Sequence, residues 1–218
     1  MSTFSDSSSG SGIGRRRFLT TAAATGGMAA LGLLGTSTAS AQQAGLPPID
    51  NDVRLGGRAV DAQFRFRGVL ASVDFRVGME FRVVRNPEDP DTSVLLEFTQ
   101  LNFTAELPGD DGSESTVTIE QRDEDVKPKS VLRLVQRDPL KFKNILVPPP
   151  FTVTIEHPDE APQVLAPKNP MKLIGNPTNF PPSGALYKLQ DPVDLVVPDD
   201  PDTTIARIRR FPVKLRGV

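Results

Sequence analysis

The sequence predicts an all-β fold, either an antiparallel β-barrel or a β-sandwich of about nine or ten strands, with little helix. Apolar residues recur at every second position in most segments beyond residue 60, which is typical of half-buried strands. All 21 prolines follow residue 46, and proline at this density interrupts helices but is compatible with strand ends and edges. No segment beyond residue 41 keeps a helical period over a helix-length window.

The strands are expected in a single β-domain at residues 61–218, preceded by an extended arm at 42–60. The clearest strand covers residues 73–83, where six apolar residues alternate with polar residues or glycine. An earlier one begins near residue 64. The remaining strands are predicted at 93–107, 116–121, 131–136, 142–147, 151–156, 186–189, 193–197 and 204–215.

The strand at 93–107 contains a conflict in its apolar pattern. Apolar residues occupy even positions from 94 to 98 and odd positions from 101 to 107. A regular strand cannot hold both sets in one core, because a slip of one residue exchanges its two faces. We therefore expect a β-bulge near Thr99-Gln100, or a strand that passes from one sheet to another.

A long proline-rich loop is predicted at residues 157–184, which include seven prolines. Loops of this length in compact domains are often binding loops or lids, although a permanent plug would have the same composition. In both cases we expect Met171, Leu173 or Phe180 to cover apolar core, because exposed apolar patches are rare.

Composition excludes several classes of site. The absence of cysteine excludes disulfides and thiolate metal sites, and a single histidine, His157, excludes zinc sites built on two histidines. We expect His157 on the surface, in a turn. With a formal net charge of −2 the chain is a poor nucleic-acid binder, and no cofactor is predicted. One tyrosine, Tyr187, and no tryptophan also disfavour a sugar-binding platform.

Acidic clusters are the recurring polar theme, and two of them lie in similar segments at 87–94 and 198–205. The calcium candidates are Asp89, Asp91, Asp200 and Asp202, since calcium is bound by carboxylate and carbonyl oxygens in such loops. None has the spacing of a calcium-loop motif, and solvated turns that discourage edge pairing are the alternative. No catalytic residue is assigned.

The last predicted strand is basic. We expect its cations either to form surface ion pairs or to dock an acidic partner. They are Arg207, Arg209, Arg210, Lys214 and Arg216.

The N-terminus carries a targeting motif. Residues 14–20 read Gly-Arg-Arg-Arg-Phe-Leu-Thr, followed by an uncharged segment to about residue 35. With Arg15, Arg16, Phe18 and Leu19 in place, this stretch resembles a twin-arginine (Tat) signal peptide. It departs from that motif in its first residue, where Ser or Thr is usual, and in its last, where Lys is common.

The resemblance covers residues 1–41 and does not extend to the remainder. Small residues at 39–41 predict cleavage by signal peptidase between Ala41 and Gln42. The resemblance implies export by the Tat machinery to a secreted or extracytoplasmic location, without a stable membrane anchor. An excess of arginine over lysine, 17 to 8, favours a bacterial source.

These observations favour a secreted, non-enzymatic β-domain that binds a small apolar ligand or a protein partner. One alternative is a small β-barrel enzyme, such as an isomerase, cyclase or hydrolase, that uses carboxylates and Tyr187. A second is a structural or adhesive β-sandwich module. An enclosed apolar cavity would favour the binding domain, and acids beside Tyr187 would favour the enzyme. A solid core would favour the structural module.

Overall fold

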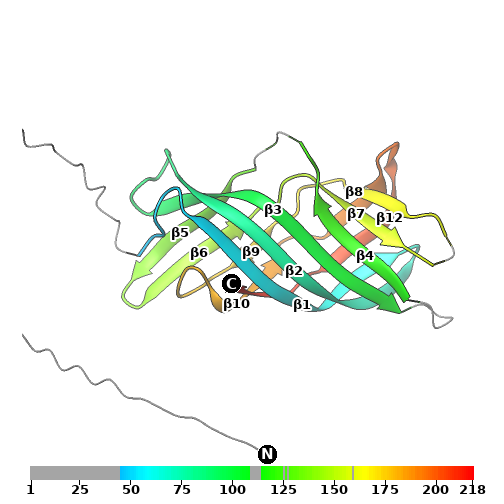
Figure 1. The fold of residues 1–218 in the computed structure, drawn as a ribbon, viewed down its shortest axis with the longest axis horizontal. Coiled ribbons are helices and arrows are strands. Elements are labelled where there is room, and N and C mark those ends of the chain that lie inside the picture. Colours follow the sequence, from blue (N-terminus) through cyan, green and yellow to red (C-terminus); the bar gives the residue numbers. More distant parts are fainter. Residues whose placement is uncertain (1–44, 109–113, 125, 127, 159) are drawn as a thin grey trace, which may run out of the picture. The chain divides into compact units, whose positions relative to one another are not determined.

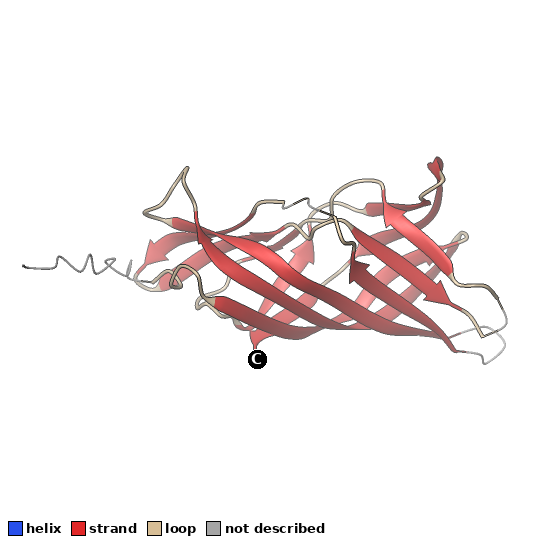
Figure 2. Cartoon of the chain, turned by 45° about the horizontal axis from the view of Figure 1, so that its top comes forward, coloured by secondary structure: helices blue, strands red, loops and turns tan. Residues whose placement is uncertain are grey.

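The computed structural model describes residues 45–108, 114–124, 126, 128–158 and 160–218. The predicted signal peptide at 1–41, with its arginine pair and its Ala41–Gln42 cleavage site, lies outside the described residues. Every regular element in the described part is a strand (Figure 2), so the predicted all-β fold is confirmed. No helix there is long and apolar enough to cross a membrane.

The described residues form thirteen strands, more than the nine or ten expected. They are β1 (Asp52–Phe66), β2 (Val69–Arg85), β3 (Ser93–Pro108), β4 (Glu114–Gln121), β5 (Ser130–Arg137), β6 (Leu140–Leu146), β7 (Phe151–Glu156), β8 (Gln163–Pro167), β9 (Leu173–Gly175), β10 (Ser183–Leu189), β11 (Val193–Val197), β12 (Asp200–Arg210) and β13 (Val213–Gly217).

The antiparallel sheet closes on itself twice. One ring of hydrogen-bonded strands runs β1-β2-β3-β4-β7-β8-β11-β12 and returns to β1, and we call it the first barrel. The other runs β1-β2-β3-β5-β6-β9-β10-β13 and also returns to β1, and we call it the second barrel. The long strands β1, β2 and β3 therefore belong to both, with β5, β6, β9 and β10 on one side and β4, β7, β8 and β12 on the other (Figure 1).

The shared strands change partners along their length. The first half of β1 pairs with β13 and its last residues with β12, while β3 pairs first with β5 and then with β4. Between these halves Phe98 lies opposite Phe81 and Gln100 opposite Glu80, which leaves Thr99 as an extra residue. The bulge predicted at Thr99-Gln100 is confirmed, and it lies where β3 passes from the second barrel to the first.

Three phenylalanine side chains pack together where the barrels meet. Phe211 lies between β12 of the first barrel and β13 of the second, and its side chain is fully buried. Its ring centroid is 5.3 Å from that of Phe75 on β2 and 5.6 Å from that of Phe103 on β3. The basic strand expected at 204–215 is thus two strands, separated at Phe211-Pro212.

Two other expectations need correction. Residues 52–60, expected within an extended arm, belong to β1, and Val53 and Leu55 are buried. Adjacent glycines at 56 and 57 interrupt the alternation that would have revealed this strand.

The segment 157–184, predicted as a loop without central strands, contains β8 and β9, each with hydrogen-bonded neighbours on both sides. These strands have five and three residues and fit between the prolines, so proline density did not prevent them. The expected coverage of the core is confirmed, because Met171 and Leu173 are buried and Phe180 packs against the core.

Candidate functional site

The outer face of the shared strands is hollowed. Gly56 on β1 lies directly opposite Gly78 on β2, so neither position carries a side chain, although the side chain of Val218 lies over Gly56. A hollow of about 250 Å³ lies over this glycine pair, and a second of about 380 Å³ extends from Gly56 towards Lys214 and Arg216 of β13. Both glycines belong to the same lateral row of the sheet, and we call them the glycine floor.

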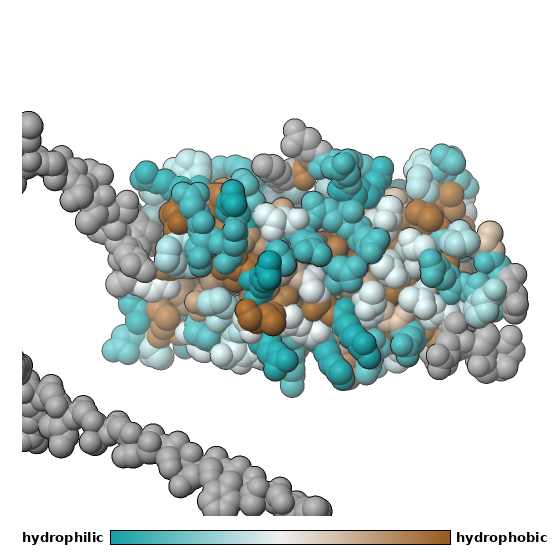
Figure 3. All heavy atoms as spheres, viewed as in Figure 1, coloured by the Kyte–Doolittle hydropathy of each residue, from teal (hydrophilic) through white to brown (hydrophobic). Residues whose placement is uncertain are grey.

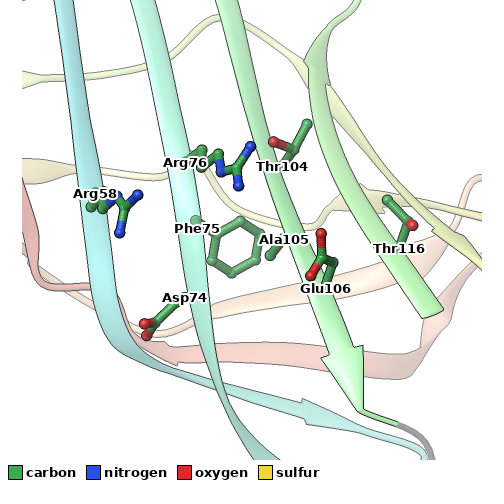
Figure 4. A pocket seen from close by; sticks show the side chains of 8 residues that line it. All are labelled: Arg58, Asp74, Phe75, Arg76, Thr104, Ala105, Glu106 and Thr116. Atoms are coloured by element: carbon green, nitrogen blue, oxygen red, sulfur yellow. The ribbon is translucent and has the colours of Figure 1, made fainter. Parts of the chain in front are cut away.

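A third hollow, of about 290 Å³, continues from the second at Arg58 (Figure 4). Its other polar lining residues come from β2, β3 and β4 and include Asp74, Arg76, Thr104 and Glu106. These three adjoining hollows form what we call the outer groove. It crosses the shared strands rather than entering either barrel.

Three cations stand in one row beside the glycine floor. Arg58 on β1 lies directly opposite both Lys214 on β13 and Arg76 on β2, and all three are exposed. Like charges placed directly opposite each other across strands are destabilising. In the described part of the chain, none of the three makes an ion pair. We call Lys214, Arg58 and Arg76 the cation row.

Two other arginines that border the glycine floor or follow it on the same face are paired with acids. Arg54 forms an ion pair with Glu80 at 3.0 Å, and Arg82 forms one with Asp52 at 3.1 Å. The hydrogen bond that Arg82 donates to Asp52 is the main reason that the pKa of Arg82 is raised. The cations that line the groove and make no ion pair with a described residue are therefore the cation row and Arg216, which lies opposite Gly56.

The far end of the outer groove is acidic. In Figure 4 the guanidinium groups of Arg58 and Arg76 lie towards one end, and the carboxylates of Asp74 and Glu106 towards the other. Asp74 accepts a hydrogen bond from the backbone nitrogen of Asp61 at 2.9 Å, which fixes its position. A ligand in the groove therefore meets opposite charges at its two ends.

The structure divides the basic C-terminal residues into two groups. On β12, Arg207 pairs with Asp194, and Arg210 pairs with Asp61 at 3.1 Å. On β13, Lys214 and Arg216 face the outer groove. The ion pairs expected for the basic segment are confirmed for Arg207 and Arg210, and docking of an acidic partner stays a prediction for the exposed cations of β13. Figure 3 shows a mainly hydrophilic surface over β1–β4, with scattered hydrophobic residues.

The calcium candidates do not converge. Asp89 accepts hydrogen bonds from the hydroxyls of Thr92 at 2.7 Å and Ser93 at 3.2 Å, and the Thr92 bond is the main cause of its lowered pKa. Asp200 and Asp202 are exposed at the start of β12, and Asp91 is exposed in the turn of Asp89. No group of three or more acids or histidines suited to a metal ion occurs among the described residues.

Tyr187 is fully buried inside the second barrel. Its phenol oxygen accepts a hydrogen bond from Nδ2 of Asn144 at 2.9 Å, and burial raises the pKa of Tyr187 to about 12. An amide rather than a carboxylate faces this hydroxyl, so the pair lacks the acid that the enzyme alternative requires.

His157 is half-buried rather than at the surface as expected.

No protein family model matches the chain, and no curated protein matches it in sequence. Among solved structures, DynF from the dynemicin biosynthesis pathway of Micromonospora chersina is similar, with a TM-score of 0.60 and 18% sequence identity. The match covers 80% of this chain and 87% of that chain. At this identity the similarity is one of fold, and it supports the all-β architecture.

Sequence reasoning missed Arg58, Arg76 and the glycine floor. Arginine at every second position of a strand indicates only a solvated face, and sequence does not reveal which outward residues meet across strands. The available signal was glycine at three positions within strongly alternating segments, Gly56, Gly57 and Gly78, because glycine inside a strand marks a bulge or a close approach.

Proposed function

We propose that this protein is an exported, non-enzymatic binding domain that docks a protein partner in the outer groove. The observation that carries the proposal is the cation row, three exposed charges on neighbouring strands, none of which forms an ion pair with a described residue. Such an arrangement costs stability in the free domain. A negatively charged partner would remove that cost.

A protein partner is favoured over a small apolar ligand. The hollows of the outer groove open to the surface and are lined by charged and polar residues together with glycine. Large side chains are buried inside both barrels, among them Phe103 and Phe151 in the first and Phe142 and Tyr187 in the second. Binding energy is therefore available on the outside of the domain.

The structural or adhesive module is the second candidate, and the filled interiors favour it. In a spacer the outer groove would have no ligand, and its cations would be a tolerated cost. The two functions differ in whether a defined partner contacts the groove.

Site-specific photo-cross-linking in the native host separates them. A photoreactive residue at Asn102, which lines the groove, should give one adduct of defined mass. The same residue at Lys141, exposed on β6 of the second barrel, should not give it. Equal labelling at both positions would contradict docking in the groove, and a co-purified small molecule would favour the apolar-ligand alternative.

The export half of the proposal has its own test. Replacing Arg15 and Arg16 together by lysine should block secretion of the full chain. The resemblance to a Tat signal peptide implies that the Tat machinery recognises this arginine pair. N-terminal sequencing of the secreted protein should give Gln42 as the first residue. Undiminished secretion of the double variant would point to the general secretory route instead.

A further inference from the structure

We propose that the outer groove recognises an acidic peptide segment of the partner, with carboxylates on the cation row and the peptide backbone over the glycine floor. This inference rests on the proposed function and names the chemistry of the partner. It follows from the spacing of the cations, the bare floor beside them and the acids at the far end.

The spacing of the row suits an extended chain. Neighbouring strands lie about 4.8 Å apart, so Lys214, Arg58 and Arg76 are spread over roughly 10 Å of the sheet. Alternate side chains of an extended peptide lie about 6.6 Å apart. A segment that crosses the strands can therefore place two acidic side chains on the row, each between two cations.

The glycine floor lets a backbone approach at Gly78. The space above Gly78 is open, since an added Cβ would meet only the carbonyl oxygen of Asn102, at 3.6 Å, whereas an added Cβ at Gly56 would lie 3.0 Å from Cγ2 of Val218. Asn102 also donates to Glu120 at 3.1 Å, which holds its amide at the rim of the floor. Glycine inside a strand is typical of places where another backbone comes close.

Other polyanions fit this surface less well. Among the residues that line the three hollows the one aromatic is Phe75, whose side chain is buried. Sugars and nucleic-acid bases depend on exposed rings for stacking, and none is offered here. Peptide recognition needs charge and hydrogen bonds, and the groove supplies both.

The acidic end sets the register of the peptide. Asp74 and Glu106 line the same hollow as Arg58 and Arg76, so a uniformly acidic chain cannot extend along its whole length. The best partner segment carries acids at the cation row and a neutral or basic residue beside Asp74. This arrangement favours such a segment over a chain that is acidic along the whole groove, while a short acidic chain can still bind at the cation row.

The probe for the test is hexaglutamate, with hexaglutamine as the uncharged control. Titration calorimetry should detect hexaglutamate and not hexaglutamine, and the affinity should fall as NaCl is raised because exposed charges are screened. The double variant Arg58→Gln, Arg76→Gln should lose at least tenfold in affinity. Arg82→Gln, on the same strand and face but paired with Asp52, should stay within twofold of the wild type.

Gly78→Leu tests the floor without changing charge, and it should weaken hexaglutamate binding while the melting temperature is kept. Equal losses for the Arg82 and the Arg58/Arg76 variants, or no binding by the folded wild type, would overturn the inference. So would inorganic sulfate that displaces hexaglutamate at equal concentration, since the site would then be one for a free oxyanion. A cross-link from Asn102 that persists in the double variant would leave the proposed function intact and refute recognition of acids.

Discussion

The two barrels share three strands but differ in how many polar side chains they bury. Among the described residues, four of the five buried polar ones lie in the strands and turns of the second barrel, Asn86, Ser93, Ser130 and Asn144, and one, Ser115, lies in the first. Besides the backbone hydrogen bonds of its strands, the first barrel is thus held together mainly by apolar packing, whereas the second combines packing with buried side-chain hydrogen bonds. Apolar contacts favour compaction without direction, and hydrogen bonds fix geometry.

Two side-chain hydrogen bonds of the second barrel lie where its strands begin and end, in addition to the bond between Asn144 and Tyr187 in its interior. Nδ2 of Asn86, after β2, donates to Oγ of Ser93, at the start of β3, at 2.7 Å. Oγ of Ser130, at the start of β5, accepts from the backbone nitrogen of Val147, just after β6, at 2.8 Å. These bonds fix the turns that lead into β3 and out of β6. We infer that the second barrel depends on specific contacts more than the first does.

The largest effect is expected where the two barrels meet. Phe211→Ala should destabilise the protein by about 3–5 kcal/mol, because it removes a buried ring that contacts Phe75 and Phe103. Since β1–β3 serve both barrels, thermal unfolding by calorimetry should remain a single transition at a lower temperature. Val135→Ala, at a side chain that is 56% exposed, is the control and should change little. Two separate transitions would show that the barrels unfold independently.

The buried tyrosine of the second barrel should make stability depend on alkaline pH. The pKa of Tyr187 is raised from 10.0 to about 12, so between these values the unfolded chain releases a proton that the folded chain keeps. Stability contributed by the neutral phenol is therefore complete below pH 10 and is lost as the pH rises towards 12. The loss should approach about 2–3 kcal/mol.

This titration can be followed at one residue, because Tyr187 is the single tyrosine and there is no tryptophan. Tyrosinate absorbance at 295 nm should have its midpoint near pH 12 in the folded protein and near 10 in urea. In Tyr187→Phe the alkaline loss should shrink relative to the wild type. A folded-state midpoint near 10 would mean that solvent reaches the interior of the second barrel.

Two glycines distinguish the interior of the second barrel from the outer groove. A Cβ at Gly175 on β9 would lie 2.6 Å from the ring of Tyr187, so Gly175→Ala should cost about 1–3 kcal/mol through overpacking. A Cβ at Gly78 would make only ordinary contact, so Gly78→Ala should be neutral or slightly stabilising. Urea unfolding of both variants measures the difference, and equal losses would contradict the open floor of the groove.

The sequence predicted what depends on local periodicity and little that depends on pairing. The alternation in β2 and the change of parity at Thr99 are properties of one strand, so the all-β class and the bulge could be predicted. The double closure depends on which edges meet across distant parts of the chain. Lys214 opposite Arg58 is a consequence of that closure, and Arg76 opposite Arg58 depends on the register of the β1–β2 hairpin, so the candidate site was not predictable.

The two similar acidic segments, one in each barrel, also show that local sequence does not determine strand pairing. In the second barrel, residues 86–92 connect β2 to β3, and Asp89 accepts hydrogen bonds from the hydroxyls of Thr92 and Ser93. In the first barrel, the corresponding residues from Asp200 onward already belong to β12, where they are exposed. Nearly identical sequences form a closed turn in one barrel and a strand end in the other, because neighbouring strands decide between them.

The smallest effects should separate these two segments. Asp89→Asn should lower the melting temperature by a few degrees, because the amide cannot replace a carboxylate that accepts from Thr92, Ser93 and, at 3.3 Å, Arg133. The lowered pKa of Asp89 means that its contribution is present above its usual value of 3.8 and is lost as the pH falls through the folded-state value. The difference in melting temperature between wild type and Asp89→Asn should therefore disappear in acid.

Asp200→Asn together with Asp202→Asn should leave the melting temperature unchanged, as is usual for exposed positions. Scans at neutral and acidic pH, each with and without calcium, make the comparison, and a stabilisation by calcium that the Asp200/Asp202 variant lacks would show a metal site in β12.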